Sequence, residues 1–110
     1  MVIRGAVYRV DLGDARRGHE QRGKRYGVVV SQSDMEWSVV TVVPTSTRAG
    51  RTVFRPEIDF GGEPTRALAD QMRTIDTRYV GDLVGYLGVA QLRSIDLALA
   101  NYLGSARLPG

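Results

Sequence analysis

The sequence predicts a mainly β fold of the α+β class, a small antiparallel β-barrel with one C-terminal helix. Short β-branched or alternating apolar runs, separated by glycine, proline and charged segments, fill most of the 110-residue chain. One segment near the C-terminus instead has apolar residues at spacings of three and four, which is typical of an amphipathic helix. Such a helix must pack against another element, and the sheet is the only partner that the pattern offers.

Three segments in the first half predict strands. Residues 6–12 alternate the apolar side chains of Ala, Tyr, Val and Leu with a more mixed set, which predicts one apolar face and one mixed face. Residues 28–31 predict a second strand after a charged loop over 13–24, and the β-branched run 39–43 is expected at the centre of the sheet. Pro44 cannot donate a ladder hydrogen bond, so we expect it to end that strand or lie at its margin.

The middle of the chain has weaker signals. We expect a strand over 52–60 that is interrupted at Pro56, and a turn at Gly61-Gly62-Glu63-Pro64. Alternation returns weakly after this turn. Residues 73–77 then predict one helical turn, and residues 83–87 a last short strand.

The terminal helix is the clearest element. It should span about fifteen residues, and its apolar stripe consists of Val89, Leu92, Ile95, Leu99 and Tyr102. Gly104 follows the end of this helix, at the position where a C-terminal cap is expected.

Composition limits the class of protein. With a mass of 12.1 kDa, the chain should form a single domain over residues 1–110. The absence of cysteine and the single histidine exclude a disulfide scaffold and any thiolate or multi-histidine metal site, and we expect no cofactor. No apolar run approaches the length of a membrane span and no signal core precedes residue 9, so we expect no membrane contact and a cytoplasmic location.

The positive charge is concentrated in the first half. Residues 1–60 contain 10 Lys or Arg against 7 Asp or Glu, whereas residues 61–110 contain 5 of each. Five of these cations fall between Arg16 and Arg25, where Glu20 is the one opposing charge. A local positive field of this kind attracts polyanions such as RNA.

Four blocks of sequence share an order and spacing with a known group of proteins. They are VYRVDLG at 7–13, GHEQ at 18–21 followed by RYGVVVS at 25–31, VVPTST at 42–47 and ALADQMRTID at 67–76. Together they resemble the MazF/PemK toxins of type II toxin–antitoxin systems, over residues 5–104. This chain departs from the family pattern at His19, where Ser is usual, at Tyr26-Gly27, where Pro follows the Arg, and at Ser46, where Thr is usual.

The resemblance implies a fold and an activity. The fold would be an SH3-like barrel of the CcdB/PemK type with a C-terminal helix. The activity would be metal-free, sequence-selective endoribonuclease cleavage of single-stranded RNA, leaving 2′,3′-cyclic phosphate and 5′-OH ends. A cognate MazE-like antitoxin would neutralise the toxin, and two copies would form a homodimer.

Three residues carry the expected catalysis. Arg25 matches the family's loop-end arginine, and its guanidinium can bind two phosphate oxygens at once. Because free guanidinium stays protonated, phosphate binding and transition-state stabilisation suit it better than general-base catalysis. Ser46 matches the family's hydroxyl residue, although Thr45 and Thr47 remain alternatives. Glu20 could act as the base or orient Arg25, or only balance charge.

Further residues are expected to contact RNA on the same resemblance. These are His19, Gln21, Lys24, Thr45, Thr47, Asp70 and Gln71. His19 has the one side chain whose ordinary pKa suits proton transfer at neutral pH. Asp70 and Gln71 could equally be structural groups with their hydrogen bonds satisfied.

Two other functions fit a barrel of this kind. Toxins that poison DNA gyrase share the fold and bind a protein target without catalysis, so fold alone does not decide. The Arg25 and Ser46 pair, which a poison does not require, favours the nuclease. A passive RNA-binding barrel would need aromatic side chains for stacking, and none lies inside the basic loop, with Tyr26 at its edge.

Overall fold

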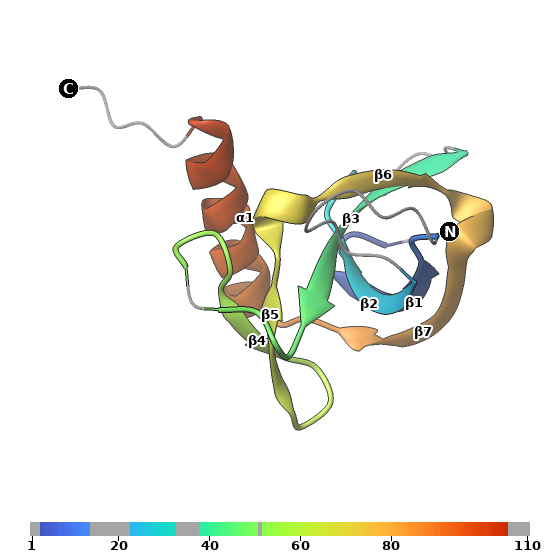
Figure 1. Ribbon diagram of the computed structural model, residues 1–110, viewed down its shortest axis with the longest axis horizontal. Helices are drawn as coiled ribbons and strands as arrows, with labels where there is room; N and C mark the ends of the chain where they lie inside the picture. The colour runs from blue at the N-terminus through green and yellow to red at the C-terminus, as the bar shows by residue number, and fades with distance from the viewer. Residues whose placement is uncertain (1–2, 14–22, 33–37, 51, 106–110) are drawn as a thin grey trace.

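The computed structural model describes residues 3–13, 23–32, 38–50 and 52–105, which form seven strands, two short 3₁₀ helices and one α-helix (Figure 1). In chain order the elements are β1 (Ala6–Asp11), β2 (Lys24–Val29), β3 (Val39–Ser46), β4 (Glu57–Asp59), β5 (Pro64–Ala67), η1 (Ala69–Gln71), β6 (Arg73–Asp76), η2 (Thr77–Tyr79), β7 (Val80–Tyr86) and α1 (Val89–Leu103). Among the described residues, no helix is long and apolar enough to cross a membrane.

The strands form one antiparallel sheet in the order β4-β5-β3-β2-β1-β7, and β6 also pairs with β3. Figure 1 shows β3, β6 and β7 curving around β1 and β2, with α1 beside β4 and β5. The side chain of Gln91 joins the helix to β4, because its Nε2 donates to the Asp59 carbonyl oxygen at 2.8 Å. The predicted fold class, a mainly antiparallel curved sheet with a C-terminal helix, is confirmed.

Consecutive valines of the central strands are buried on both faces of the sheet. Val28 and Val43 belong to a core that includes Ile95 of α1. Val29 and Val42 belong to a second core inside the curved part of the sheet. Successive side chains of a strand point to opposite faces, so an uninterrupted valine run is what a strand between two cores requires.

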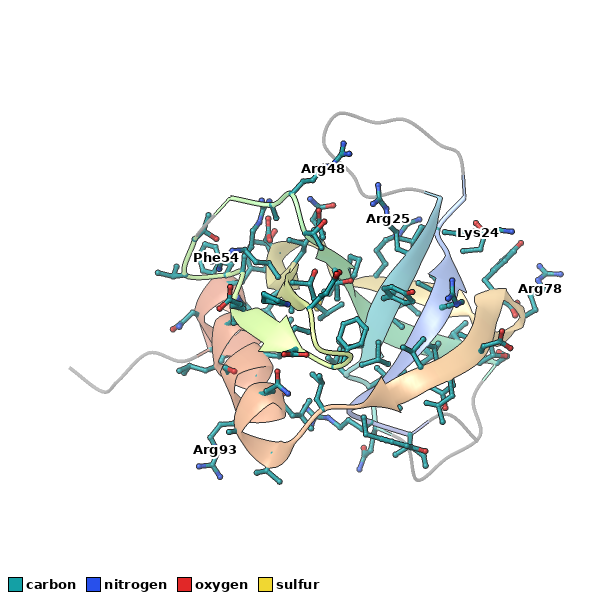
Figure 2. The ribbon with its side chains drawn as sticks, turned by 90° about the horizontal axis from the view of Figure 1, so that it is seen from below. Lys24, Arg25, Arg48, Phe54, Arg78 and Arg93 are labelled. Atoms are coloured by element: carbon teal, nitrogen blue, oxygen red, sulfur yellow. The ribbon has the colours of Figure 1, made fainter. Side chains whose placement is uncertain are left out.

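The second strand begins earlier than the sequence predicts. It starts at Lys24 and ends at Val29, because Lys24 pairs with Asp11 and Arg25 pairs with Val10 of β1. The expectation of a strand over 28–31 was therefore wrong, since main-chain pairing with β1 does not depend on apolar side chains. As a result Lys24 and Arg25 lie on a strand rather than at the end of a loop (Figure 2).

Pro44 marks a change of partner within β3. It is the last residue of β3 paired with β2, opposite Gly27. The next residue, Thr45, pairs with Ala67 of β5, and the strand continues to Ser46. Pro44 thus ends one ladder, while β3 itself continues beyond it.

The second half of the chain differs most from the prediction. Residues 73–76 form strand β6, paired with Val39–Val42 of β3, where a helical turn was predicted. The helical turns fall on either side, at η1 and η2. Residues 52–54 form a turn, so only Glu57–Asp59 of the expected 52–60 strand is a strand. The predicted strand at 83–87 corresponds to the second half of β7, which begins at Val80 and ends at Tyr86. Pairing with distant β3 decided these assignments.

The helix has the predicted length, with Gly104 as a left-handed C-cap at φ 74°. Its buried residues are Ile95 and Ala98. Val89 and Tyr102, placed in the apolar stripe by periodicity, are 77% and 47% exposed. The ends of the stripe therefore extend beyond the part of the helix that the rest of the fold covers.

We expect Gly27→Ala to lower the free energy of unfolding by about 1 kcal/mol, because overfilling a packed core costs about this much. A methyl group at Gly27 would lie 3.1 Å from Val10 Cγ2 and 3.3 Å from Val42 Cβ, and both valines are buried. Chemical denaturation measures the change. Gly50→Ala is the matched control, since a Cβ at Gly50 meets nothing within 4 Å. Equal stability of the two variants would contradict the proposed tight contact.

Candidate functional site

A cavity of about 830 Å³ opens beside the ends of β1, β2 and β3. These three strands supply about half of its wall, and the β4–β5 turn, β5, η2 and β7 supply most of the remainder. Its lining comprises Arg9, Val10, Asp11, Lys24, Arg25, Tyr26, Thr45, Ser46, Thr47, Phe60, Gly61, Glu63, Thr65, Tyr79, Gly81, Asp82 and Val84. A space of this size can hold a small ligand or part of a polymer.

Strand pairing brings Arg25 and Ser46 to the same part of the cavity. The ladder between β2 and β3 ends with Gly27 opposite Pro44. Beyond it, the Thr45 hydroxyl donates a 3.2 Å hydrogen bond to the Tyr26 carbonyl oxygen, which keeps the strands side by side. Continuing this antiparallel register sets Arg25 alongside Ser46, and both residues line the cavity.

The three candidate hydroxyls differ in their surroundings. Thr45 is 4% exposed, and its hydroxyl is engaged by the bond to the β2 main chain. Thr47 is exposed beyond the end of β3. Ser46 is half-buried, and its Oγ accepts a 3.2 Å hydrogen bond from the Arg48 main-chain N–H. Because that bond uses a lone pair, the Ser46 O–H group keeps its proton for donation.

Cationic side chains gather at this end of the molecule. Arg25 and Lys24 are exposed on β2, and Arg48 is exposed just after β3. Figure 2 shows all three on the same side of the molecule, away from Arg93 on α1. The cavity wall also carries acidic residues, of which Asp11 lies opposite Lys24 on the neighbouring strand. The positive field that would attract phosphate therefore comes from the three exposed cations and not from the cavity wall as a whole.

The first loop contributes sites that lie outside the described residues. Glu20, His19 and Gln21, expected as base or RNA contacts, fall within 14–22. The structure therefore does not test them.

Asp70 and Gln71 lie on η1 and are absent from the cavity lining. Both carboxylate oxygens of Asp70 accept hydrogen bonds from Arg55, from Nε at 3.0 Å and from Nη2 at 2.9 Å. These bonds lower the pKa of Asp70 below its ordinary value and raise the pKa of Arg55. The Asp70 carboxylate thus has hydrogen-bond partners within the fold. Contact of Asp70 or Gln71 with RNA stays a prediction.

Several cavity residues were missed by sequence reasoning. Arg9 belongs to the mixed face of β1, and that alternation was the available signal. Phe60, Tyr79 and Asp82 carried no signal, because they reach the cavity only through the pairing of distant strands. In the described part of the chain, no group of three or more His, Asp or Glu side chains is arranged to hold a metal ion.

We expect Asp70→Asn to lower stability at pH 7 by about 1 kcal/mol, because a bidentate ion pair that is partly exposed contributes about that much. The Asp70 pKa is depressed by folding. Its contribution is therefore fully present above the carboxyl group's ordinary pKa of about 4 and is lost as pH falls through the lowered folded value. Denaturation of both proteins across pH measures the difference, which should shrink in acid. A difference that is constant down to strongly acidic pH would contradict this assignment.

Relatives of known sequence cover nearly the whole chain. Rv3098A/RVBD_3098A of Mycobacterium tuberculosis (strain ATCC 25618 / H37Rv), named as a candidate toxin, is 63% identical over 105 residues, which are 94% of this chain and 99% of that protein. Endoribonuclease MazF9 of the same strain is 30% identical over 116 residues, covering 94% of this chain and 97% of the relative.

Solved structures agree with the fold. An endoribonuclease in complex with its cognate antitoxin, from a mycobacterial species, superimposes with a TM-score of 0.81 at 25% identity, covering 99% of this chain and 100% of that one. MazF of Deinococcus radiodurans superimposes with a TM-score of 0.82 at 22% identity over 94% and 96% of the two chains, which supports the fold alone. The family model of the PemK-like, MazF-like toxins matches residues 3–103. The predicted resemblance is confirmed, and the chain belongs to the PemK-like, MazF-like toxins of type II toxin–antitoxin systems.

Proposed function

We propose that this protein is a toxin endoribonuclease that cleaves single-stranded RNA in the cavity beside β2 and β3. The observation that carries this proposal is that Arg25 of β2 and Ser46 of β3, two neighbouring strands, line one cavity. A cation with two parallel N–H donors next to a hydroxyl donor suits a phosphodiester. The relative that is 30% identical is named an endoribonuclease, which supports the same activity.

The proposed reaction is an internal phosphoryl transfer that needs no metal. The ribose 2′-oxygen attacks the adjacent phosphorus, and the bond from phosphorus to the 5′-oxygen of the next nucleotide breaks. The products are a 2′,3′-cyclic phosphate and a 5′-OH end. A base must take the proton of the 2′-OH, and an acid must protonate the leaving 5′-oxygen.

Arg25 would stabilise the charge that develops on the phosphoryl oxygens, because its guanidinium can bind two of them. Ser46 would donate a hydrogen bond to a phosphoryl oxygen through the proton that its contact with Arg48 leaves available. Glu20 is our candidate for the base or for an orienting partner of Arg25. Arg25 could also donate the proton to the leaving group.

We infer that a cognate antitoxin neutralises the protein by occupying the same cavity. Exposed Lys24, Arg25 and Arg48 would attract an acidic segment. A structure neighbour at 25% identity is named as a complex with its cognate antitoxin, which supports such a partner. We further propose that the 1–110 chain is one domain, acts in the cytoplasm and forms a homodimer.

Purified protein should cleave single-stranded RNA equally well with and without EDTA, because no step is assigned to a metal. Duplex RNA should resist. Mapping the 5′ ends and testing the 3′ ends for cyclic phosphate measures both site and chemistry. Activity that disappears with EDTA and returns with Mg²⁺ would overturn the mechanism. Failure to cleave any RNA, with inhibition of DNA gyrase, would support the alternative of a non-catalytic poison.

Arg25→Ala should lower the cleavage rate roughly a hundred- to a thousand-fold, as expected when a main charge-stabilising donor is removed. Arg25→Lys should recover little, because a point charge cannot replace two parallel donors. Single-turnover cleavage of a mapped RNA measures the rate. Arg93→Ala is the control, since Arg93 is an exposed arginine on α1. Unchanged cleavage by Arg25→Ala would remove Arg25 from the mechanism.

A further inference from the structure

A cation and two aromatic rings form one wall of the cavity. Arg9 of β1 and Tyr26 of β2 are directly paired across the strands, and the guanidinium carbon of Arg9 lies 5.2 Å from the centre of the Tyr26 ring. Phe60 meets the same ring edge to face, with centroids 5.4 Å apart. Tyr26 and Phe60 are half-buried in a core cluster, so the rings are held in place, while Arg9 is exposed.

The neighbouring strand β7 is irregular at this point. Tyr8 pairs with Leu83 and Val10 pairs with Val80, so two residues of β7, Gly81 and Asp82, oppose Arg9 alone. Such a bulge re-aims side chains and is common beside functional sites. Gly81 and Asp82 both line the cavity.

The Asp82 carboxylate can accept hydrogen bonds from a ligand. It is exposed, and within the described ranges it forms no ion pair. An ionised carboxylate only accepts hydrogen bonds, so it favours a ligand with an amino group.

We propose that Arg9, Tyr26, Phe60 and Asp82 form a binding subsite for one unpaired nucleobase of the RNA. The base stacks on the Arg9–Tyr26 pair, as bases in single strands stack on guanidinium planes and aromatic rings. Asp82 accepts from its exocyclic amino group, as acidic side chains do from cytosine. The subsite therefore prefers bases with an amino group over uracil. This inference rests on the proposed function, because it assumes that RNA enters the cavity.

The position along β2 favours a nucleobase over a side chain of a protein partner. Tyr26 directly follows Arg25, the proposed phosphate ligand, and both line the cavity. Phosphate and base are likewise neighbouring groups of one nucleotide, so adjacent contacts on the strand can serve both. Tyr26 stands where the family pattern has proline, so that pattern does not provide this ring.

The test is equilibrium binding of fluorescent 2′-fluoro oligocytidine and 2′-fluoro oligouridine, which lack the 2′-OH and are not cleaved. The wild-type protein should bind oligocytidine more tightly. Tyr26→Ala and Arg9→Ala should weaken oligocytidine binding about five- to a hundred-fold, the range for loss of one stacked base. Tyr26→Phe, which keeps the ring, should bind like the wild type. Asp82→Ala should reduce the preference for cytidine.

Tyr102→Ala is a matched control. Tyr102 also makes an edge-to-face contact, with Phe54 at 5.3 Å, but it lies on α1 and does not line the cavity. Thermal unfolding checks that Tyr26→Ala folds. If Tyr26→Ala does not fold, Arg9→Ala decides the test, because Arg9 is exposed and belongs to neither core cluster.

Cleavage of natural RNA, measured in parallel, separates this inference from the proposed function. If the wild type cleaves RNA but Arg9→Ala and Tyr26→Ala bind both oligonucleotides as tightly as Tyr102→Ala, the subsite is overturned alone. If the wild type does not cleave but binding depends on Tyr26 and Arg9, the subsite stands and the nuclease fails. An acidic peptide is tested in the same binding assay. Variants that bind both oligonucleotides like the wild type but no longer bind this peptide would assign these residues to a protein partner and overturn the subsite. No binding of either oligonucleotide by the wild type would overturn it as well.

Discussion

The antiparallel pairing of β2 with β1 and β3 is the constraint on which the rest of the structure depends. It buries consecutive valines against two cores, one beneath α1 and one inside the curved sheet. The same pairing extends past the valines into Lys24 and Arg25, where the side chains are exposed. Core burial at one end of β2 therefore positions the cationic end, because both belong to one continuous strand.

Pro44 links the core to the site. Since proline has no N–H, β3 ends its ladder with β2 there and continues beside β5. The Thr45 hydroxyl then substitutes for the ladder by bonding to the Tyr26 carbonyl oxygen. This arrangement leaves room at the strand ends for the cavity while keeping Arg25 and Ser46 on adjacent strands. The ion pair between Arg55 and Asp70 joins the segment between β3 and β4 to η1. Neither residue lines the cavity.

The cavity wall combines two kinds of group that suit different parts of a nucleotide. The ends of β2 and β3 present cations and hydroxyls, which suit phosphate. The strands β1 and β2, with the β4–β5 turn, present a stacked cation and two aromatic rings, which suit a base. The passive RNA-binding alternative was set aside for want of aromatics in the loop. Tyr26 and Phe60 reach the cavity from a strand and a turn instead, so stacking and catalysis are compatible in one site.

The sequence by itself determined the features that depend on neighbours along the chain. The valine runs predicted buried strands, the spacing of Leu92, Ile95 and Leu99 predicted the helix, and Gly104 predicted its cap. The ordered blocks identified the family and, through it, pointed to Arg25 and Ser46 as candidate site residues. Only the tertiary structure decided where β2 begins, that residues 73–76 are a strand and that Phe60 and Asp82 share a cavity with Arg9. Those outcomes follow from hydrogen bonds and bulges between segments far apart in the chain, which local propensity does not encode.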